Sequence, residues 1–126
     1  MKDMRYCLEK MEAAGRLARV KTRVDAVHEL SGLSAKLEGG RALLFEKVKG
    51  YDYPLTTGWW WDRDNVAAIF DRPAADIPWL FADAVDSLRS APVAPIVVDD
   101  APCREVCFPE PDLTRIPVPT HALLDG

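Results

Sequence analysis

The sequence predicts an α/β (α+β) fold, in which helices flank a mixed sheet and a proline-rich extended arm follows at the carboxyl end. Some stretches place apolar residues every three or four positions, as helices do, and others alternate or run together, as strands do. Seven of the ten prolines lie in the last 35 residues, and proline fixes φ and lacks an amide donor. We therefore predict a domain over residues 1–108 and an extended arm over residues 109–126.

The first elements predicted along the chain are a helix, a strand and a second helix. Residues 2–14 carry apolar side chains at helical spacing, and Gly15 is placed to end the helix. Residues 17–24 alternate apolar and basic side chains, which is typical of a half-buried strand. Asp25 is placed to cap the second helix, which ends at Gly39. The side chains predicted to form the buried stripe of this helix are Val27, Leu30, Leu33 and Leu37.

Two strands and another helix are predicted next. Residues 42–48 are a short apolar run ahead of a turn, the pattern of a buried strand. A second strand is predicted from Leu55 through three consecutive tryptophans at residues 59–61. Asp62 is placed to cap a helix over residues 65–70.

The last predicted elements are a longer helix and two short strands. Residues 78–88 have the helical spacing of apolar side chains. The side chains predicted to face inward are Leu80, Phe81, Ala84, Val85 and Leu88. Residues 95–98 and 104–108 are strand candidates on either side of a turn at residues 99–102.

Composition and charge exclude several classes of protein. The chain has 16 Lys and Arg against 20 Asp and Glu, and its net charge of −4 argues against nucleic acid or an anionic membrane as a partner. No apolar run approaches the roughly 18 residues that a membrane span needs, so none is predicted. Three cysteines are an odd number without the spacing of a disulfide framework, which predicts reduced thiols in a cytoplasmic protein.

Cysteine and histidine side chains offer little evidence of metal binding or catalysis. Cys103 and Cys107 lie four residues apart in a predicted strand and His121 follows, whereas zinc usually takes four ligands. We therefore predict no metal site and favour buried thiols that act as small hydrophobes. His28 has no partner motif for a general base, which favours a surface or packing role. The sequence lacks the common phosphate-binding, dinucleotide-binding, zinc-protease and serine-hydrolase motifs, so no catalytic residue is predicted.

The end of the arm and the tryptophan run leave alternatives open. Pro119 orders the backbone before His121, and Gly126 permits a sharp turn, so His121 is either a loop histidine that docks the arm or part of a site. In a strand, Trp60 would oppose Trp59 and Trp61. Stacking on a base or a flavin ring is one interpretation of these side chains. Packing into the core on one face, and against another domain or subunit on the other, is favoured.

Four stretches resemble one known family in the order that the family has them. They are residues 8–17, 24–31, 39–50 and 112–121, with Asp125 and Gly126 following the last. Together they resemble the amino-terminal part of the UbiD-like decarboxylases, the prenylated-flavin-dependent enzymes that include the 3-polyprenyl-4-hydroxybenzoate carboxy-lyases. The tryptophan run at residues 59–61 departs from the family, where this stretch is usually less bulky.

The resemblance implies a role that the residues alone do not indicate. In the family, a mixed α/β amino-terminal domain precedes a split-barrel domain that holds prenylated FMN with a divalent metal and potassium. The family's catalytic arginine and glutamates, and its metal ligands, lie beyond the point where this chain stops, so no catalytic or metal residue is carried over. Residues 117–121 with Asp125 and Gly126 mark the entrance to the cofactor domain, and Thr120, His121 and Asp125 are therefore the candidates for cofactor contact.

The resemblance leads to one expected function and two alternatives. Family members are several times longer than 126 residues, so we interpret the chain as a fragment, a truncated chain or a small subunit of a UbiD-like (de)carboxylase. It is expected to be inactive alone, to need the remaining cofactor domain or subunit as partner, and to act within an oligomer. The first alternative is a stand-alone binding or regulatory module that uses the face of Trp59, Trp60 and Trp61. The second is a small metalloprotein that uses Cys103, Cys107 and His121.

Overall fold

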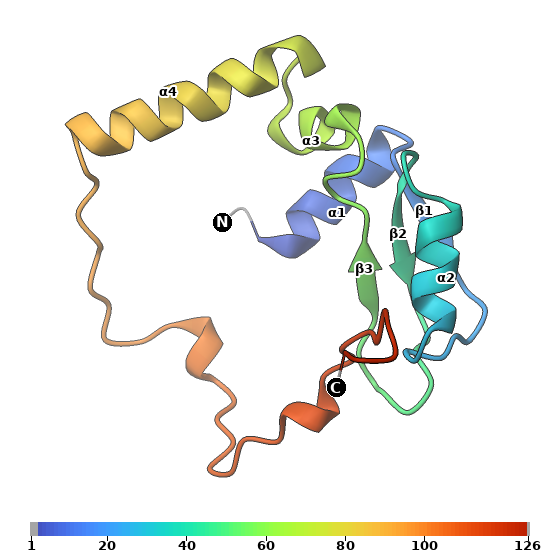
Figure 1. Ribbon diagram of the computed structural model, residues 1–126. Coiled ribbons are helices and arrows are strands. Elements are labelled where there is room, and N and C mark those ends of the chain that lie inside the picture. The colour runs from blue at the N-terminus through green and yellow to red at the C-terminus, as the bar shows by residue number, and fades with distance from the viewer. Residues whose placement is uncertain (1–2, 126) are drawn as a thin grey trace.

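The structure, a computed structural model, describes residues 3–125 and has the predicted α/β architecture, with helices on both faces of a mixed sheet (Figure 1). Within this range its helices and strands are α1 (Met4–Ala13), β1 (Leu17–Val20), α2 (Glu29–Lys36), β2 (Ala42–Phe45), β3 (Leu55–Thr57), α3 (Arg63–Phe70) and α4 (Ile77–Ser90). Short 3-10 helices are formed by Ala74–Asp76, Pro102–Arg104 and Leu113–Arg115. No helix of the described residues is both long and apolar enough to cross a membrane.

The central strand of the sheet is β2, which is buried along its whole length. It pairs in parallel with β1, where Val20 lies opposite Phe45, and antiparallel with β3, where Leu55 lies opposite Phe45. The chain passes from β1 to β2 through α2, a crossover of the kind that a parallel pair requires. The continuous apolar run that predicted a buried strand is thereby explained, because both faces of β2 are covered.

Side chains alternate along β2, so the strand contributes to two hydrophobic clusters. On one face Phe45 packs with Leu30 of α2, in what we call the α2-side cluster. On the other face Leu44 packs with Met11 of α1 and Ile69 of α3, in what we call the α1-side cluster. The domain is therefore a three-layer arrangement in which one strand supplies both cores.

A buried amide joins the turns at one end of the sheet. The Asn65 side chain is fully buried, and its Nδ2 donates to the carbonyl oxygens of Gly40 at 3.1 Å and Gly58 at 3.0 Å. Its Oδ1 accepts a hydrogen bond from Nε of Arg16 at 2.8 Å, and the same guanidinium forms an ion pair with Asp62. As predicted, Asp62 also caps α3 by accepting a hydrogen bond from an amide of its first turn.

β1 and β2 are both shorter than the strands predicted at these places. β1 ends at Val20 and β2 ends at Phe45. Beyond them the two chain segments pair again only at a parallel bridge between Val24 and Val48, both of which are buried. The apolar pattern therefore identified Val24 and Val48 as buried positions, although the hydrogen-bonded ladder between the strands is interrupted.

The three tryptophans lie in a turn, so the prediction that they continue a strand is wrong. Gly58 follows β3 with φ +81°, and a Cβ atom there would lie 2.3 Å from the ring of Trp61, so glycine is required. Trp59 packs on the α1-side cluster and donates from Nε1 to Oγ1 of Thr56 at 2.7 Å. Trp61 packs on the α2-side cluster, whereas Trp60 is 69% exposed.

The second helix also begins later than predicted. α2 starts at Glu29, and Asp25 does not cap it but accepts a hydrogen bond from the amide of Val27 at 3.0 Å. Leu30 is buried as predicted, but Val27 and Leu37 are exposed. Both lie outside the two turns of α2, so the helical spacing that placed them on the buried face does not apply to them.

No strand forms at residues 95–98 or 104–108, contrary to the prediction. Residues 102–104 are a 3-10 helix. Residues 93–98 have no backbone hydrogen bond with any residue in the range 3–125. A strand needs a partner strand, and this part of the described chain has none beside it.

The helix α4 is present, but most of its apolar face is not turned inward as predicted. Ile77 is buried and Leu80 is half-buried, and both pack against α3. Farther along the same face Phe81, Val85 and Leu88 are 42%, 48% and 62% exposed. Figure 1 shows why, because α4 runs away from the sheet after its first turns.

Replacement of Asn65 should test how strongly the buried amide holds the turns together. Asn65→Ala should lower the free energy of unfolding by about 2–4 kcal/mol, because the carbonyls of Gly40 and Gly58 and the guanidinium of Arg16 lose a buried partner. Urea unfolding followed by circular dichroism measures the change. Arg63→Ala, at an exposed position of the same helix, should change it by less than about 0.5 kcal/mol. Equal losses in the two variants would contradict this role.

Candidate functional site

The end of the described chain returns to the connection between β1 and α2, where it is held by a junction centred on Thr120 (Figure 1). The amide of Thr120 donates to the carbonyl of Ala26 at 3.0 Å, and the carbonyl of Thr120 accepts from the amide of His28 at 3.1 Å. Oγ of Ser31 donates to the same carbonyl at 3.2 Å. We call these contacts the Thr120 junction.

The local backbone around His28 makes this junction possible. His28 precedes α2 with φ +64° and ψ −37°, and the amide of Glu29 donates to the carbonyl of Val27 at 2.7 Å, which is the strained geometry of a γ-turn. The amide of His28 comes before the first residue of α2 and has no acceptor within that helix, and it donates to the returning chain instead. On the returning chain Pro117 is buried and Pro119 is half-buried, so two residues of fixed φ lie directly before Thr120.

Next to the junction, the carboxylate of Asp125 closes a turn of the backbone. Its Oδ2 accepts hydrogen bonds from the amides of His121 at 2.7 Å and Ala122 at 2.8 Å. These two amides hold the pKa of the carboxyl below its ordinary value, and the positive charges that His121 and His28 can carry add to the effect. Asp125 is therefore ionised at neutral pH and engaged by its own backbone.

The structure thus brings together the three candidates for cofactor contact and adds His28 to them. Thr120 is half-buried, while His121 and Asp125 are exposed. Gly126, which was expected to permit a sharp turn here, lies outside the described residues. What the three share is a role in holding the backbone, through the contacts described above.

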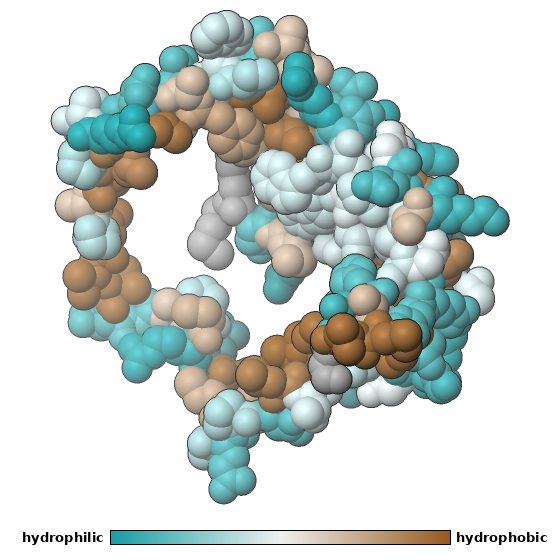
Figure 2. All heavy atoms as spheres, in the orientation of Figure 1, coloured by the Kyte–Doolittle hydropathy of each residue, from teal (hydrophilic) through white to brown (hydrophobic). Residues whose placement is uncertain are grey.

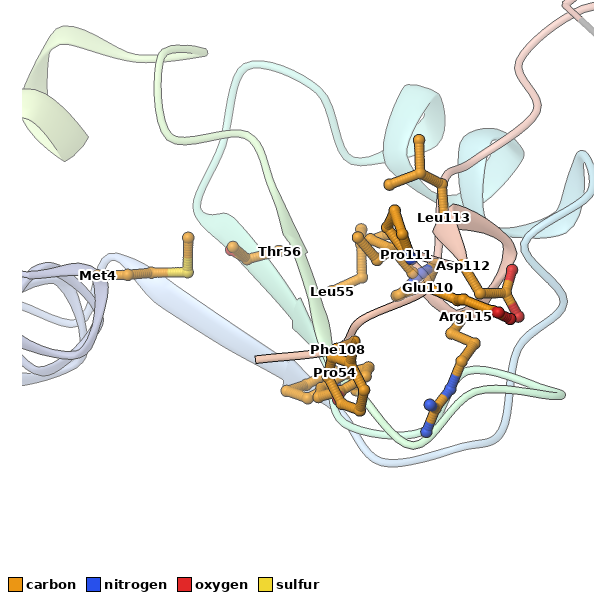
Figure 3. A pocket seen from close by; sticks show the side chains of 13 residues that line it. Met4, Pro54, Leu55, Thr56, Phe108, Glu110, Pro111, Asp112, Leu113 and Arg115 are labelled. Atoms are coloured by element: carbon orange, nitrogen blue, oxygen red, sulfur yellow. The ribbon is translucent and has the colours of Figure 1, made fainter. Parts of the chain in front are cut away.

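A cavity of about 760 Å³ lies between β3 and residues 108–117 (Figure 3). Most of its wall is apolar, and the side chains that make this wall include Met4, Pro54, Leu55, Phe108, Leu113 and Ile116. The polar groups on its border are committed locally. Asp112 accepts hydrogen bonds from the hydroxyl and, with a smaller effect, the amide of Thr114, and both lower the pKa of its carboxyl. The Cζ atom of Arg115 lies 5.3 Å from the ring centroid of Phe108.

The described residues do not make a metal site. In the range 3–125 no group of three or more His, Cys, Asp and Glu side chains is placed to hold a metal ion. Cys103 and Cys107, which we expected to be buried strand thiols, are both exposed, Cys103 within a 3-10 helix and Cys107 after it. Without a partner strand this segment has no layer to bury them, so that prediction is wrong. His121 lies at the Thr120 junction and does not complete a set of ligands with them.

The described residues also do not fit a complete flavin site. A cavity of this volume is within the range of small-molecule sites, but a flavin phosphate needs cationic or amide donors. The one cation on the border of the cavity, in the described part of the chain, is Arg115, which stacks on Phe108. At the Thr120 junction, the amides that face the returning chain already have carbonyl or carboxylate partners.

Ala26 and Ser31 were not identified from the sequence as parts of this junction. Ser31 and Thr120 are 89 positions apart, and no local pattern predicts a contact over such a distance. The alternation of prolines at residues 117 and 119 was the one usable signal, because it indicated an ordered backbone that needs a neighbouring surface. The surface that Thr120 contacts, at Ala26 and Ser31, shows no sequence pattern that indicates a contact.

Comparison with known proteins shows that the chain is similar to parts of longer proteins. Residues 8–84 match the model of a family described as the 3-octaprenyl-4-hydroxybenzoate carboxy-lyase N-terminal domain. An uncharacterized protein in the cooM 5′ region of Rhodospirillum rubrum is 46% identical over 125 residues, which are 98% of this chain and 27% of that protein. A protein of Archaeoglobus fulgidus is 44% identical over 55 residues, which are 42% of this chain and 11% of that protein.

Solved structures give the same result in three dimensions. The chain is similar to an evolved dimeric form of the UbiD-class enzyme HmfF from Pelotomaculum thermopropionicum in complex with prFMN, with a TM-score of 0.81 and 36% identity over 97% of this chain and 28% of HmfF. It is also similar to HmfF in complex with FMN, with a TM-score of 0.78 and 37% identity over 94% of this chain and 26% of HmfF. The chain spans about a quarter of these relatives.

The Thr120 junction should depend on the amide of Thr120. Thr120→Pro removes the donor to Ala26, so we expect residues 117–122 to detach and the amide of His28 to exchange hydrogen faster, by tenfold or more. Hydrogen exchange followed by mass spectrometry or NMR measures this. Val118→Pro is the matched control, because Val118 is exposed and its amide has no backbone partner among residues 3–125. Similar exchange rates in both variants would refute the junction.

The turn closed by Asp125 should respond to acid in a defined direction. Because its pKa is lowered in the folded chain, the ionised carboxylate supports the turn above pH 3.8 and loses that role as the pH falls through the lower, folded value. An NMR titration of the carboxyl carbon should therefore give a midpoint below 3.8, with the amide signals of His121 and Ala122 shifting together with it. In Asp125→Asn this titration should disappear. A midpoint at or above 3.8 in the unchanged chain would contradict the assignment.

Proposed function

Because the chain belongs to the 3-octaprenyl-4-hydroxybenzoate carboxy-lyase N-terminal domain family, we propose that it acts as the amino-terminal domain or small subunit of a UbiD-like, prenylated-flavin-dependent (de)carboxylase. The substrates proposed are aromatic or α,β-unsaturated carboxylic acids. One observation carries this proposal. Nearly the whole chain, 97% of it, is similar in structure and sequence to HmfF in complex with prFMN, while it covers 28% of that enzyme.

We place the flavin, its divalent metal and potassium on the part of the enzyme that lies outside this chain. The described residues provide no metal cluster, and the cavity beside β3 lacks free donors for a phosphate. The catalytic arginine and glutamates are placed there too. The chain alone is therefore expected to be inactive.

The role proposed for the chain's own residues is to set the direction in which the polypeptide reaches the cofactor-bearing part. Residues 1–108 would be the domain, and residues 109–126 an arm that leads from it. The Thr120 junction fastens this arm to the connection between β1 and α2, and Asp125 closes the turn directly after it. Thr120, His121 and Asp125 would then position the backbone at the entrance of the cofactor site.

The setting proposed for this enzyme is a cytoplasmic oligomer. The three cysteines are free in the structure, which agrees with a reducing compartment. HmfF has been solved in an evolved dimeric form, so an oligomer is a reasonable state for a relative of this class. The partner proposed for the chain is the remaining cofactor domain or subunit.

A stand-alone binding module that uses the tryptophan face is the alternative, and the geometry supports it less. Trp59 and Trp61 are engaged in the two hydrophobic clusters, and only Trp60 of the three is mostly exposed. A single exposed indole can anchor a partner, so Trp60→Ala distinguishes the two functions. It should leave the assembly of an enzyme intact, but it would abolish binding in the alternative.

Reconstitution tests the proposed function. The chain should be produced together with the remainder of the Rhodospirillum rubrum relative, meaning the part that has no counterpart in this chain, and with a supply of prenylated FMN, a divalent metal and potassium. We expect a complex that carries flavin absorbance and releases CO₂ from an aromatic or α,β-unsaturated acid, because neither part holds the whole site. The chain alone and the remainder alone are the controls. Full activity of the remainder alone, or a complex with neither flavin nor activity, would contradict the proposal.

A further inference from the structure

The large apolar side chains divide sharply between the two halves of the chain. Among the described residues, the buried hydrophobic core ends at Ile77. From Trp79 to Leu124, fifteen large apolar side chains are exposed, against six in the part before it. Exposed apolar surface on this scale marks a place where a protein meets a partner.

On α4 this exposure forms one continuous stripe. Ile77 and Leu80 begin the stripe and pack against α3. Phe81 contacts Phe70 of α3, and Val85 and Leu88 continue the stripe at spacings of three and four residues and are exposed. The last contact of the stripe with α3 is the edge-on packing of Phe81 against Phe70, whose ring centroids are 5.6 Å apart. The apolar face of α4 beyond Phe81 is therefore exposed, with no cover from the described residues.

The segment after α4 adds apolar backbone that has no hydrogen-bonded partner among the described residues. Ile96, Val97 and Val98 are 89%, 91% and 58% exposed, and all three are β-branched. Residues 93–98 have no backbone hydrogen bond with any residue of the described range. Figure 2 shows the apolar side chains of this segment on the surface, on the arc that continues from α4. Extended apolar backbone without a partner is suited to join the edge of another sheet.

Charge distinguishes this region from the rest of the chain. Residues 77–110 contain six acidic and two basic residues, a net charge of −4, which equals the net charge of the whole chain. The rest of the chain therefore has no net charge, because it contains fourteen acidic and fourteen basic residues. A second copy placed on the same surface would bring like charges together, whereas a partner with basic residues around an apolar centre would be attracted.

We propose that the exposed face of α4 and residues 93–98, which we call the α4 surface, bind the cofactor-bearing part of the enzyme. Residues 96–98 pair with the edge of a sheet in that part, and Val85 and Leu88 fill an apolar depression bordered by basic side chains. The inference rests on the proposed function. The occupant follows from the comparisons, because nearly three quarters of HmfF, and of the Rhodospirillum rubrum relative, has no counterpart in this chain.

The test is the affinity of the chain for the remainder of the Rhodospirillum rubrum relative, measured by interferometry on purified proteins. Val85→Asp combined with Leu88→Asp should weaken binding at least tenfold, because it places charges in the apolar centre. Val97→Pro should weaken it as well, because it removes a backbone donor. Ser90→Asp adds one negative charge on the opposite side of α4 and should change the affinity less than twofold. All these side chains are exposed, so the folded spectrum of each variant should be unchanged.

The outcomes separate this inference from the proposed function. If the remainder of the relative binds every variant with the same affinity, the α4 surface is refuted and the proposed function still stands. A complex that is sensitive to Val85→Asp with Leu88→Asp, yet has no flavin and no activity, would support the surface and contradict the function. Absence of any complex would overturn both. A homodimer that the double variant dissociates would show that a second copy occupies the surface, which also overturns the inference.

Discussion

The rest of the domain depends on the hydrogen bonds of one buried side chain, that of Asn65. A fully buried amide must find a partner for each of its polar atoms, and here those partners come from different connections of the fold. Gly40 precedes β2, Gly58 follows β3, and Arg16 lies between α1 and β1. By satisfying all of them, one residue at the start of α3 fixes where three strands begin or end. The ion pair of Arg16 with Asp62 then ties the same point to the first turn of α3.

The packing of the helices on the sheet follows from the burial of a single strand, β2. Four residues of β2 divide between the α1-side and α2-side clusters, so the helices on either face are positioned by alternate side chains of the same segment. These elements were predictable from the sequence because their signals are local. The apolar run at residues 42–48 and the cap at Asp62 report on neighbours within a few positions. Strand ends were less predictable, since they depend on turns such as that at Gly58.

What the sequence could not predict is set by contacts over long distances. Thr120, His121 and Asp125 were recognised as candidates. The residues that hold Thr120 lie before and within α2, and no sequence pattern there indicates a contact with the end of the chain. Two further predictions failed for one shared physical reason. Residues 95–98 were expected to be a strand, and the apolar face of α4 was expected to face inward. Both signals require a covering layer, and residues 3–125 do not supply it.

The Thr120 junction has a consequence for the entropy of the segment between the two attachments. Residues 78–116 contain no buried residue, yet they are fixed at Ile77 on one side and at Pro117 on the other. A segment held at both ends explores far fewer conformations than a free tail of equal length, because the closure of the loop has already taken place during folding. Ordering it on a partner therefore sacrifices less conformational freedom. Two prolines and a threonine, far from α4 in sequence, thus prepare this segment for contact without touching it.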